Sequence, residues 1–148
     1  MDQKIWGETV EIFKNETVSV HYLKIKKGGV CSWHHHKQKY NQFNVLSGAI
    51  IIRCGLESHV LKPGMGRRIE PDESHEFEGL EDSQVIETTF VKLDPEDIVR
   101  ARVGYIKELV TCPVCHGSCT VPYEDDFGVG KNTCTKCLGS GKVYREKI

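Results

Sequence analysis

The sequence predicts an all-β protein: a small antiparallel barrel followed by a metal-stapled tail. Short runs rich in Val, Ile, Thr and aromatic residues recur along the first hundred residues, and turn residues such as Gly28, Gly48 and Gly64 separate them. This spacing of about 8–12 residues between turns is typical of sandwiches and barrels. Five of the seven cysteines lie after residue 110, four of them in two Cys-x-x-Cys pairs. We therefore expect a barrel domain over residues 1–103 and a small module over residues 104–148.

The length and composition of the chain limit the classes of function that it can have. A chain of 148 residues can hold one domain of ordinary size plus a small stapled module. A formal net charge of −1 gives no electrostatic attraction to nucleic acid or anionic membranes. The first residues lack the apolar segment of a signal peptide, and no apolar run reaches the roughly 18 residues of a membrane-spanning helix. We expect a cytoplasmic protein whose partners include neither nucleic acid nor a membrane.

The expected strands follow from alternating or β-branched runs bounded by turn residues. They cover residues 9–15, 16–27, 34–36, 41–46, 49–54, 57–61, 67–70, 75–80 and 84–93. The segment 94–102 begins with Asp94 and Pro95, which suit the start of a helix, so it is expected to form a short helix or a turn that closes the barrel. Residues 103–110 then connect the barrel to the tail.

Three histidines form the first candidate site. Successive side chains of a strand point to opposite faces, so His34 and His36 share one face and His35 points to the other. His75, on a later strand, can join the first two when the sheet closes. Three neutral imidazoles on rigid strands form a site for a divalent transition metal such as Zn, Fe, Mn or Ni. The histidines His21 and His59 lie in polar strand contexts and are not expected to be ligands.

The spacing around these histidines resembles the double motif of the cupin superfamily. The residues that carry the resemblance are Gly28, His34, His36, Asn41 and Gly48 in the first motif, and Gly66, Pro71 and His75 in the second. Phrases outside the motifs, such as Lys4–Glu8 and Leu61–Gly64, are similar to small single-domain cupins related to the C-terminal domain of type II mannose-6-phosphate isomerases. The resemblance covers about the first hundred residues and implies a double-stranded β-helix, or jelly-roll, barrel that holds a metal.

Asn41 departs from the motif, because that family usually has Glu at this position. An amide offers a neutral carbonyl oxygen and cannot accept a proton near neutral pH. Asn41 is therefore a candidate fourth metal ligand or a group that orients a bound water, with Gln42 as its competitor if the strand carries a bulge. The general base is left open among Glu70, Glu73, Glu87 and Tyr40.

Several other side chains have two interpretations. The basic residues Arg53, Arg67, Arg68 and Lys39 could bind a phosphate or carboxylate at the barrel mouth, or lie on exposed strand positions. The aromatic residues Trp33, Tyr40, Phe43 and Phe77 could line a pocket, although core packing is commoner in small barrels. We expect Cys31 and Cys54 to be buried, inert thiols.

The four cysteines Cys112, Cys115, Cys134 and Cys137 predict a structural zinc site in the tail. Two Cys-x-x-Cys pairs separated by 18 residues match the spacing of four-cysteine zinc sites. The pattern C-x-x-C-x-G-x-G resembles the cysteine-rich region of DnaJ-type chaperones, which implies a zinc-stapled β-hairpin. The second pair matches it fully, whereas the first has Cys119 in place of the last Gly. Cys119 and His116 are spare donors.

Three functions are compatible with these features. The first is a metal-dependent sugar or sugar-phosphate isomerase or epimerase acting on a small polar or sugar-like ligand, which rests mainly on the family resemblance. The second is a dioxygenase that holds Fe(II) with three histidines. The third is a non-catalytic module in which the zinc tail binds a protein partner. Open sheet edges are commonly covered by a second subunit, so we expect a homodimer.

Overall fold

The computed structural model describes residues 2–125 and 128–148. The chain forms two compact units, one made of residues up to 106 and the other of Lys107–Lys147. The described residues form strands and turns with no helix, and hence none that is long and apolar enough to cross a membrane. The predicted all-β class is confirmed.

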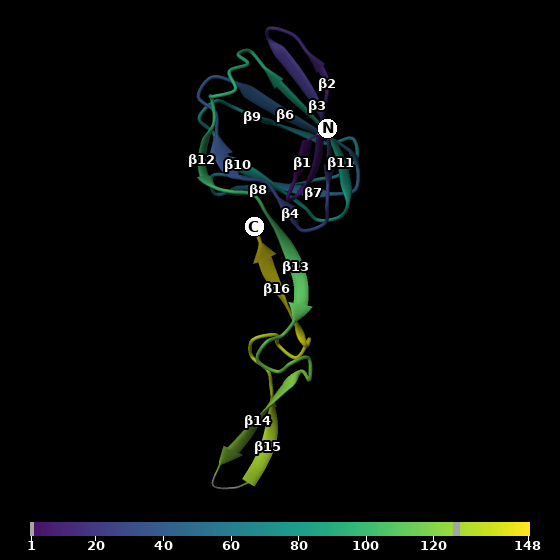
Figure 1. Cartoon of the computed structure of the whole chain (residues 1–148), viewed down its shortest axis with the longest axis vertical. Helices are drawn as coiled ribbons and strands as arrows, with labels where there is room; N and C mark the ends of the chain where they lie inside the picture. The colour runs from purple at the N-terminus through teal and green to yellow at the C-terminus, as the bar shows by residue number, and fades with distance from the viewer. Residues whose placement is uncertain (1, 126–127) are drawn as a thin grey trace. The chain divides into compact units, whose positions relative to one another are not determined.

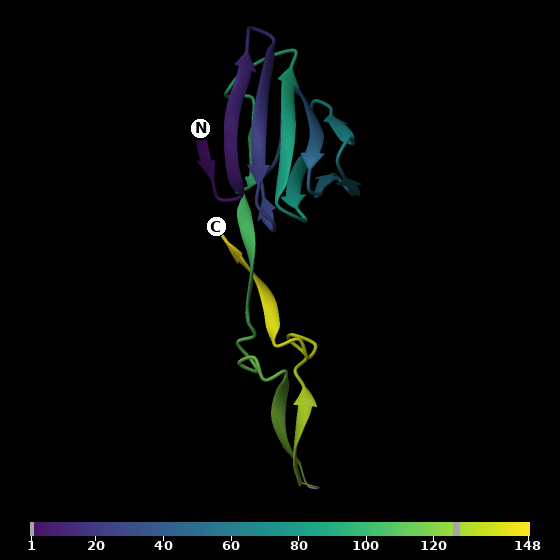
Figure 2. The ribbon, with the colours of Figure 1, turned by 90° about the vertical axis from the view of Figure 1, so that its right-hand side faces the viewer.

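The first sheet of the barrel has six strands in the order β1-β2-β3-β11-β6-β9, all paired antiparallel. Figure 2 shows β2, β3, β11 and β6 running side by side. The bounds are β1 Asp2–Lys4, β2 Gly7–Lys14, β3 Val18–Ile25, β6 Tyr40–Ser47, β9 Gly66–Ile69 and β11 Ser83–Phe90. The β-branched run in β11 places this strand at the centre of the sheet, where both of its edges are paired.

The second sheet is built around β10, which pairs with β4, β5 and β7. Beyond these, β12 pairs with β5 and β8 pairs with β7, while the first residues of β13 pair with β4. Figure 1 shows the two sheets rolled into a barrel. The bounds are β4 Gly29–Val30, β5 Trp33–His35, β7 Ile50–Cys54, β8 Glu57–Leu61, β10 His75–Gly79, β12 Val99–Arg102 and β13 Tyr105–Thr111.

The hydrophobic core fills one part of the barrel interior. Its buried members are Leu23, Ile25, Cys31, Phe43, Val45, Ile50, Ile52, Cys54, Leu61, Ile69, Phe77 and Val85. Trp6 covers the core with its ring edge-to-face on Phe77, at 5.0 Å between centroids. Burial of this apolar surface is the main favourable contribution to folding of the barrel.

The segment 94–102 differs from its first expectation. It contains a turn, closed by the hydrogen bond from the Asp97 amide to the Asp94 carbonyl at 3.1 Å, and then the strand β12. A helix does not form because Val99–Arg102 pairs with β5 instead. The alternative of a turn is correct, and the strand after it was not expected.

The second unit contains two pairs of strands. The later part of β13 lies beside β16 (Lys142–Lys147), and β14 (Thr120–Asp125) pairs antiparallel with β15 (Gly128–Thr133). The two cysteine-containing segments lie between these pairs, at residues 112–119 and 134–141. The β14–β15 hairpin, labelled in Figure 1, agrees with the β-hairpin that the resemblance implies for the tail.

Candidate functional site

The pairing of β5 with β10 brings the histidines together. His34 lies directly opposite His75 in the ladder, and His36 follows two residues after His34. The ring centroids of His34 lie 4.4 Å from His75 and 4.9 Å from His36. One ring nitrogen from each of the three histidines lies within 4.8 Å of the others. Such a cluster could hold one metal ion.

Each of the three imidazoles makes the same backbone hydrogen bond through Nδ1. The acceptors are the carbonyl oxygens of Ser32 for His34 (2.7 Å), of Asp97 for His36 (2.6 Å) and of Glu73 for His75 (2.9 Å). A carbonyl oxygen only accepts, so each Nδ1 carries the proton and each Nε2 keeps a free lone pair. Metal-binding histidines commonly have this arrangement, because the bond fixes the tautomer and the orientation of the ring.

The surroundings of the three imidazoles favour their neutral form. Burial is the largest cause in each case: it lowers the pKa of His34 to about 3 and that of His36 to about 4, and it lowers the pKa of His75 as well. The neighbouring imidazoles act in the same direction on His34. The neutral form is the one that binds a metal, so the site is ready for ligation at neutral pH.

Asn41 lies on β6 with its amide in the barrel interior. Its Nδ2 donates a hydrogen bond of 2.6 Å to Oε1 of Glu87, whereas its Oδ1 is buried and has no partner among the described residues. His75 Nε2 is likewise buried, with no partner in the same part of the chain. Buried polar atoms without a hydrogen bond are costly and rare, and a bound ion can satisfy them. Both atoms are therefore candidates for binding an ion.

Gln42 points to the opposite face of β6 from Asn41. Its Nε2 contacts Asn44 Oδ1 at 3.3 Å, outside the barrel interior. The pairing of Asn41 and Gln42 with both neighbouring strands continues without a bulge at these positions. The register therefore favours Asn41 over Gln42 as the amide of the site.

The interior of the first sheet changes from apolar to polar along its strands. Directly paired residues of antiparallel strands project to the same face. One such row contains Val45, Val85 and Leu23, all buried. The next inward row contains Phe43, Glu87 and His21. The row with Glu87 and His21 thus adds an acid and an imidazole to the barrel interior.

A pocket of about 460 Å³ opens beside the histidines. His34, Glu87, His21 and Thr89 contribute polar groups to its lining, and Trp6 is among its apolar members. Burial raises the pKa of the Glu87 carboxyl, and the Asn41 hydrogen bond and the Lys39 charge offset this only in part. Volumes of roughly 300–1,000 Å³ are usual for small-molecule sites. The pocket therefore has the size and the polar groups to take a small polar molecule.

The other basic candidates lie in ion pairs or beside a backbone carbonyl. Arg53 contacts Glu76 and Glu78, Arg67 contacts Glu73, and Arg68 contacts Glu70. Lys39 donates to the Asp94 carbonyl at 3.1 Å and lines a separate, smaller pocket. None of the four lines the pocket beside His34.

The remaining histidines and aromatic residues have different roles. His35 and His59 do not belong to the three-histidine group, but His21 lines the pocket, which its polar strand context did not indicate. Phe43 and Phe77 are buried in the core, and Phe77 also lines the pocket. Tyr40 stacks on Phe90, with 5.3 Å between the ring centroids. Cys31 and Cys54 are buried as expected, and burial raises the pKa of both thiols, that of Cys54 to about 11.

Asp97 is a site residue that the sequence did not reveal. Besides its carbonyl on His36, its buried carboxylate accepts the backbone N–H groups of Lys37 at 2.7 Å and Gln38 at 3.0 Å. These three bonds fix the loop that follows β5, and with it the ring of His36. The run of acids after Pro95 was the available signal, but it equally suits the first turn of a helix.

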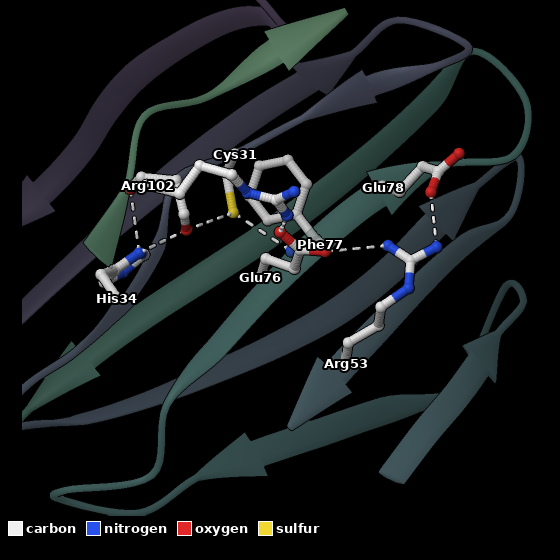
Figure 3. A network of polar contacts seen from close by, with 8 residues as sticks. Cys31, His34, Arg53, Glu76, Phe77, Glu78 and Arg102 are labelled. Carbon is white, nitrogen blue, oxygen red and sulfur yellow. Dashed lines mark hydrogen bonds and ion pairs between the residues drawn. The ribbon is translucent and has the colours of Figure 1, made fainter. Parts of the chain in front are cut away.

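Figure 3 shows an ionic network that joins Glu76 and Glu78 of β10 to arginines of neighbouring strands. His75 and Phe77 point into the barrel, so Glu76 and Glu78 point out, yet both are buried. Arg53 of β7 contacts Glu76 at 3.1 Å and Glu78 at 2.5 Å, and Arg102 of β12 contacts the other oxygen of Glu76. The network ties β12, β10 and β7 together and so supports the strand that carries His75.

The four predicted zinc ligands are brought together in the second unit. Cys112, Cys115, Cys134 and Cys137 are all buried, with their sulfurs within 4.8 Å of one another. The sulfurs of Cys112 and Cys134 are 3.8 Å apart and those of Cys115 and Cys137 are 3.6 Å apart. Zn–S bonds of about 2.3 Å in a tetrahedron place sulfurs about 3.8 Å apart. The cluster therefore has the dimensions of a zinc site.

The two cysteine segments have matching backbones. Ser118 Oγ donates to the Cys115 carbonyl at 2.6 Å, and Ser140 Oγ donates to the Cys137 carbonyl at 2.7 Å. Residues 116 and 138 both have positive φ angles, and each is followed by a Gly with positive φ. Cys119, at the position equivalent to Gly141, also has positive φ and is half-exposed. Neither Cys119 nor His116 belongs to the four-sulfur group.

Comparisons with known proteins agree with this architecture. Residues 21–91 match the family model described as a cupin domain, while a comparison with curated proteins finds no match. KdgF from Halomonas sp. is 22% identical with a TM-score of 0.60, over 64% of this chain and 88% of that chain. The capsular polysaccharide assembling protein CapF from Staphylococcus aureus is also 22% identical with a TM-score of 0.60, over 70% of this chain but 34% of CapF.

A third solved structure, a variant of PAC13 from Streptomyces with uridine, is 10% identical with a TM-score of 0.60, over 69% of this chain and 83% of that chain. At these identities the likeness shows the fold alone. The expected jelly-roll barrel is confirmed.

Proposed function

We propose that the barrel, in which residues 21–91 match a cupin-domain model, is a metal-dependent enzyme that isomerises or epimerises a small sugar-like substrate. One observation carries the proposal. Three imidazoles with free Nε2 atoms converge, and one of them, His34, lines a pocket that also contains the carboxylate of Glu87. The combination of a metal-binding group and a carboxylate with a raised pKa is what proton transfer next to a carbonyl requires.

The Nε2 atoms of His34, His36 and His75 would hold the metal, with Asn41 Oδ1 as a neutral fourth ligand. A divalent ion such as Zn, Fe, Mn or Ni would supply Lewis-acid polarisation of adjacent hydroxyl and carbonyl oxygens of the substrate. The protein adds rigid backbone bonds to each Nδ1, which hold the three rings in place without a ligand.

Glu87 is the general base in this proposal. Its carboxylate would take the proton from the carbon beside the carbonyl and return it to the neighbouring carbon, or to the same carbon in an epimerisation. Asn41 Nδ2 fixes the position of Glu87 Oε1. The other candidates fit less well, because Glu70 and Glu73 pair with Arg68 and Arg67, and none of Glu70, Glu73 and Tyr40 lines the pocket.

Two observations support a sugar-like substrate. The motifs resemble those of type II mannose-6-phosphate isomerases, and two of the fold neighbours are named with carbohydrate-containing molecules, a capsular polysaccharide and uridine. The pocket, at about 460 Å³, is large enough for one sugar ring.

The test combines elemental analysis with turnover. Purified protein is assayed for bound metals and for conversion of mannose 6-phosphate and related aldoses and ketoses. We expect two metals per chain and metal-dependent conversion that chelation abolishes. Iron in the barrel with substrate-dependent O₂ consumption would instead identify a dioxygenase. Zinc confined to the tail, with no turnover, would identify a non-catalytic binding module.

The tail is proposed to hold one structural zinc and to offer a surface for a protein partner. Val114 and Leu138 lie beside its cysteines and are 53% and 83% exposed. We also propose a homodimer, because β1 and β9 lie at the ends of the six-stranded sheet. A cytoplasmic location suits a protein whose seven cysteines are all outside disulfide bonds.

A further inference from the structure

Arg100 lies beside the candidate metal site. It is on β12, directly opposite His34 in the antiparallel ladder. Paired residues of an antiparallel ladder project to the same face, so the side chains of Arg100 and His34 share one face of the sheet. Both line the pocket of about 460 Å³. The guanidinium is close enough to His34 for its charge to contribute to the lowered pKa of that ring.

Arg100 differs from the other arginines in its partners. Arg53, Arg67, Arg68, Arg102 and Arg145 each contact a carboxylate. The Arg100 guanidinium makes no hydrogen bond or ion pair with any residue in 2–125 or 128–148, and its side chain is exposed at the pocket. The pocket thus presents five N–H donors that no residue in those ranges binds.

Among the described charged residues that line the pocket, Arg100 is the cation left to bind an anion, because the other basic groups have acidic neighbours. Lys4 contacts Asp2 at 2.5 Å, and His21 lies 3.7 Å from Glu11. Glu87 would repel an anionic group, whereas Arg100 would attract one. A bound molecule with an anionic group and a reacting carbon is therefore oriented, with the anion at Arg100 and the reacting carbon toward Glu87.

We infer that the substrate is an anion, a sugar acid or sugar phosphate whose oxyanion is bound by Arg100. The inference deepens the proposed function and rests on it. The planar guanidinium can donate two parallel hydrogen bonds to a carboxylate or a phosphate. The neutral part of the substrate then lies over the three histidines and Glu87. Arg100 is a binding residue that sets specificity and takes no part in proton transfer.

The experiment measures binding to the metal-loaded full-length protein by isothermal titration calorimetry. The probes are D-glucose, D-glucuronate and D-glucose 6-phosphate, which share a ring and differ in charge. The variants are Arg100→Gln and Arg100→Lys, and Arg68→Gln serves as the matched control because Arg68 lies outside the pocket in a pair with Glu70. Thermal unfolding of each variant checks the fold.

We expect at least one anion to bind about tenfold or more tightly than glucose, and the preference to weaken as NaCl is raised. Arg100→Gln should remove the preference, Arg100→Lys should retain part of it, and Arg68→Gln should leave it unchanged. Preference for glucuronate identifies a carboxylate and preference for glucose 6-phosphate identifies a phosphate. Equal binding of all three sugars, binding of none, or a preference that survives Arg100→Gln would overturn the inference. Metal content and turnover, measured separately, would still test the proposed function.

Discussion

Asn41 and Glu87 are joined across β6 and β11 by a hydrogen bond of 2.6 Å from Nδ2 to Oε1. The bond uses one of the two N–H donors of the amide, and Oδ1 is buried without a partner among the described residues. The cupin motif usually has a glutamate at position 41, and here the carboxylate lies one strand away at position 87. This chain lacks the motif's carboxylate at position 41, and the carboxyl group of Glu87 is instead hydrogen-bonded to the Asn41 amide.

The amide at position 41 should matter for metal affinity. Asn41→Ala removes both the unpartnered carbonyl oxygen and the hydrogen bond to Glu87. We expect the affinity of the barrel for Mn²⁺ or Zn²⁺ to fall about 10- to 100-fold, the usual effect of losing a supporting group at a metal site. Competition with a chromophoric chelator measures this. Gln42→Ala, on the outer face of the same strand, should leave the affinity unchanged, and an equal loss in both variants would contradict the assignment of Asn41.

Replacement of Glu87 by Gln should stop catalysis without removing metal. Gln has the size of Glu but cannot accept a proton, so turnover should fall about 10²- to 10⁴-fold. Steady-state kinetics and metal analysis of the same preparation provide the two measurements. Glu70→Gln is the control, because Glu70 pairs with Arg68 outside the pocket. Full activity of Glu87→Gln would exclude Glu87 as the base.

Removing one of the four cysteine ligands should prevent the tail from folding. Cys134→Ser leaves three sulfurs around a site that supplies most of the stability of a small module. We expect loss of one zinc per chain and rapid proteolysis within residues 107–147. Cys119→Ser should keep the zinc, because Cys119 is outside the four-sulfur group. Zinc loss from the Cys119 variant instead would mean that the ligand set is wrong.

The stability of the metal-free barrel should fall as the pH drops below 6.5. The pKa values of His34 and His36 are about 3 and about 4 in the folded protein, and their ordinary value is 6.5. Below pH 6.5 the unfolded chain binds protons that the folded chain does not, so acid favours unfolding. The contribution of these rings to stability is full above about pH 6.5 and is lost progressively as the pH falls toward their folded pKa values of about 4 and about 3. The part of this range from about pH 6.5 to about 5 precedes the titration of most carboxylates.

Tryptophan fluorescence during urea unfolding measures this in the barrel alone, because both tryptophans, Trp6 and Trp33, precede residue 106. At about pH 5 the slope of the unfolding free energy against pH should correspond to at least about two protons, because burial lowers the pKa of His75 as well as those of His34 and His36. The double variant His34→Asn and His36→Asn should have a smaller slope of unfolding free energy against pH. Increasing stability as the pH falls from about 6.5 to about 5 would contradict buried, neutral imidazoles.

The buried carboxylate of Glu76 should stabilise the barrel from its outer face. Glu76→Gln removes a charge shared by Arg53 and Arg102, and hydrogen bonds between charged groups contribute about 1.5–3 kcal/mol. We expect the free energy of unfolding to fall by about that amount, measured by urea denaturation at a fixed, mildly alkaline pH. Glu57→Gln, an exposed carboxylate beside His59, is the control and should change it by less than about 0.5 kcal/mol.

Most of the barrel could be predicted from local patterns. The expected strands at 57–61 and 75–80 correspond to β8 and β10, because alternation and turn residues are local properties of the sequence. The segment that forms β12 could not be predicted, because its strand character comes from pairing with β5, more than sixty residues earlier. Asp94 and Pro95 begin a helix and a turn equally well.

Only part of the candidate site could be predicted from the sequence, because the rest also depends on pairing between distant strands. The His-x-His spacing places two rings on one face of one strand, and the motif resemblance adds His75. By contrast, Glu87 is one of four candidates for the general base, and only its register with Phe43 and His21 distinguishes it from the other three. Arg100 enters the site through its register with His34. Register depends on how distant strands align, which a single sequence does not reveal. The contact of the Asp97 carbonyl with His36 has no side-chain signal at all.

Anomalous diffraction from crystals grown with excess Mn²⁺ or Zn²⁺, recorded on both sides of the metal edge, tests the central claim most directly. We expect two peaks per chain. One lies about 2.1 Å from Nε2 of His34, His36 and His75, and the other about 2.3 Å from the sulfurs of Cys112, Cys115, Cys134 and Cys137. A map with density at the four sulfurs and none at the three imidazoles would contradict a metal centre in the barrel, and the proposed catalysis with it.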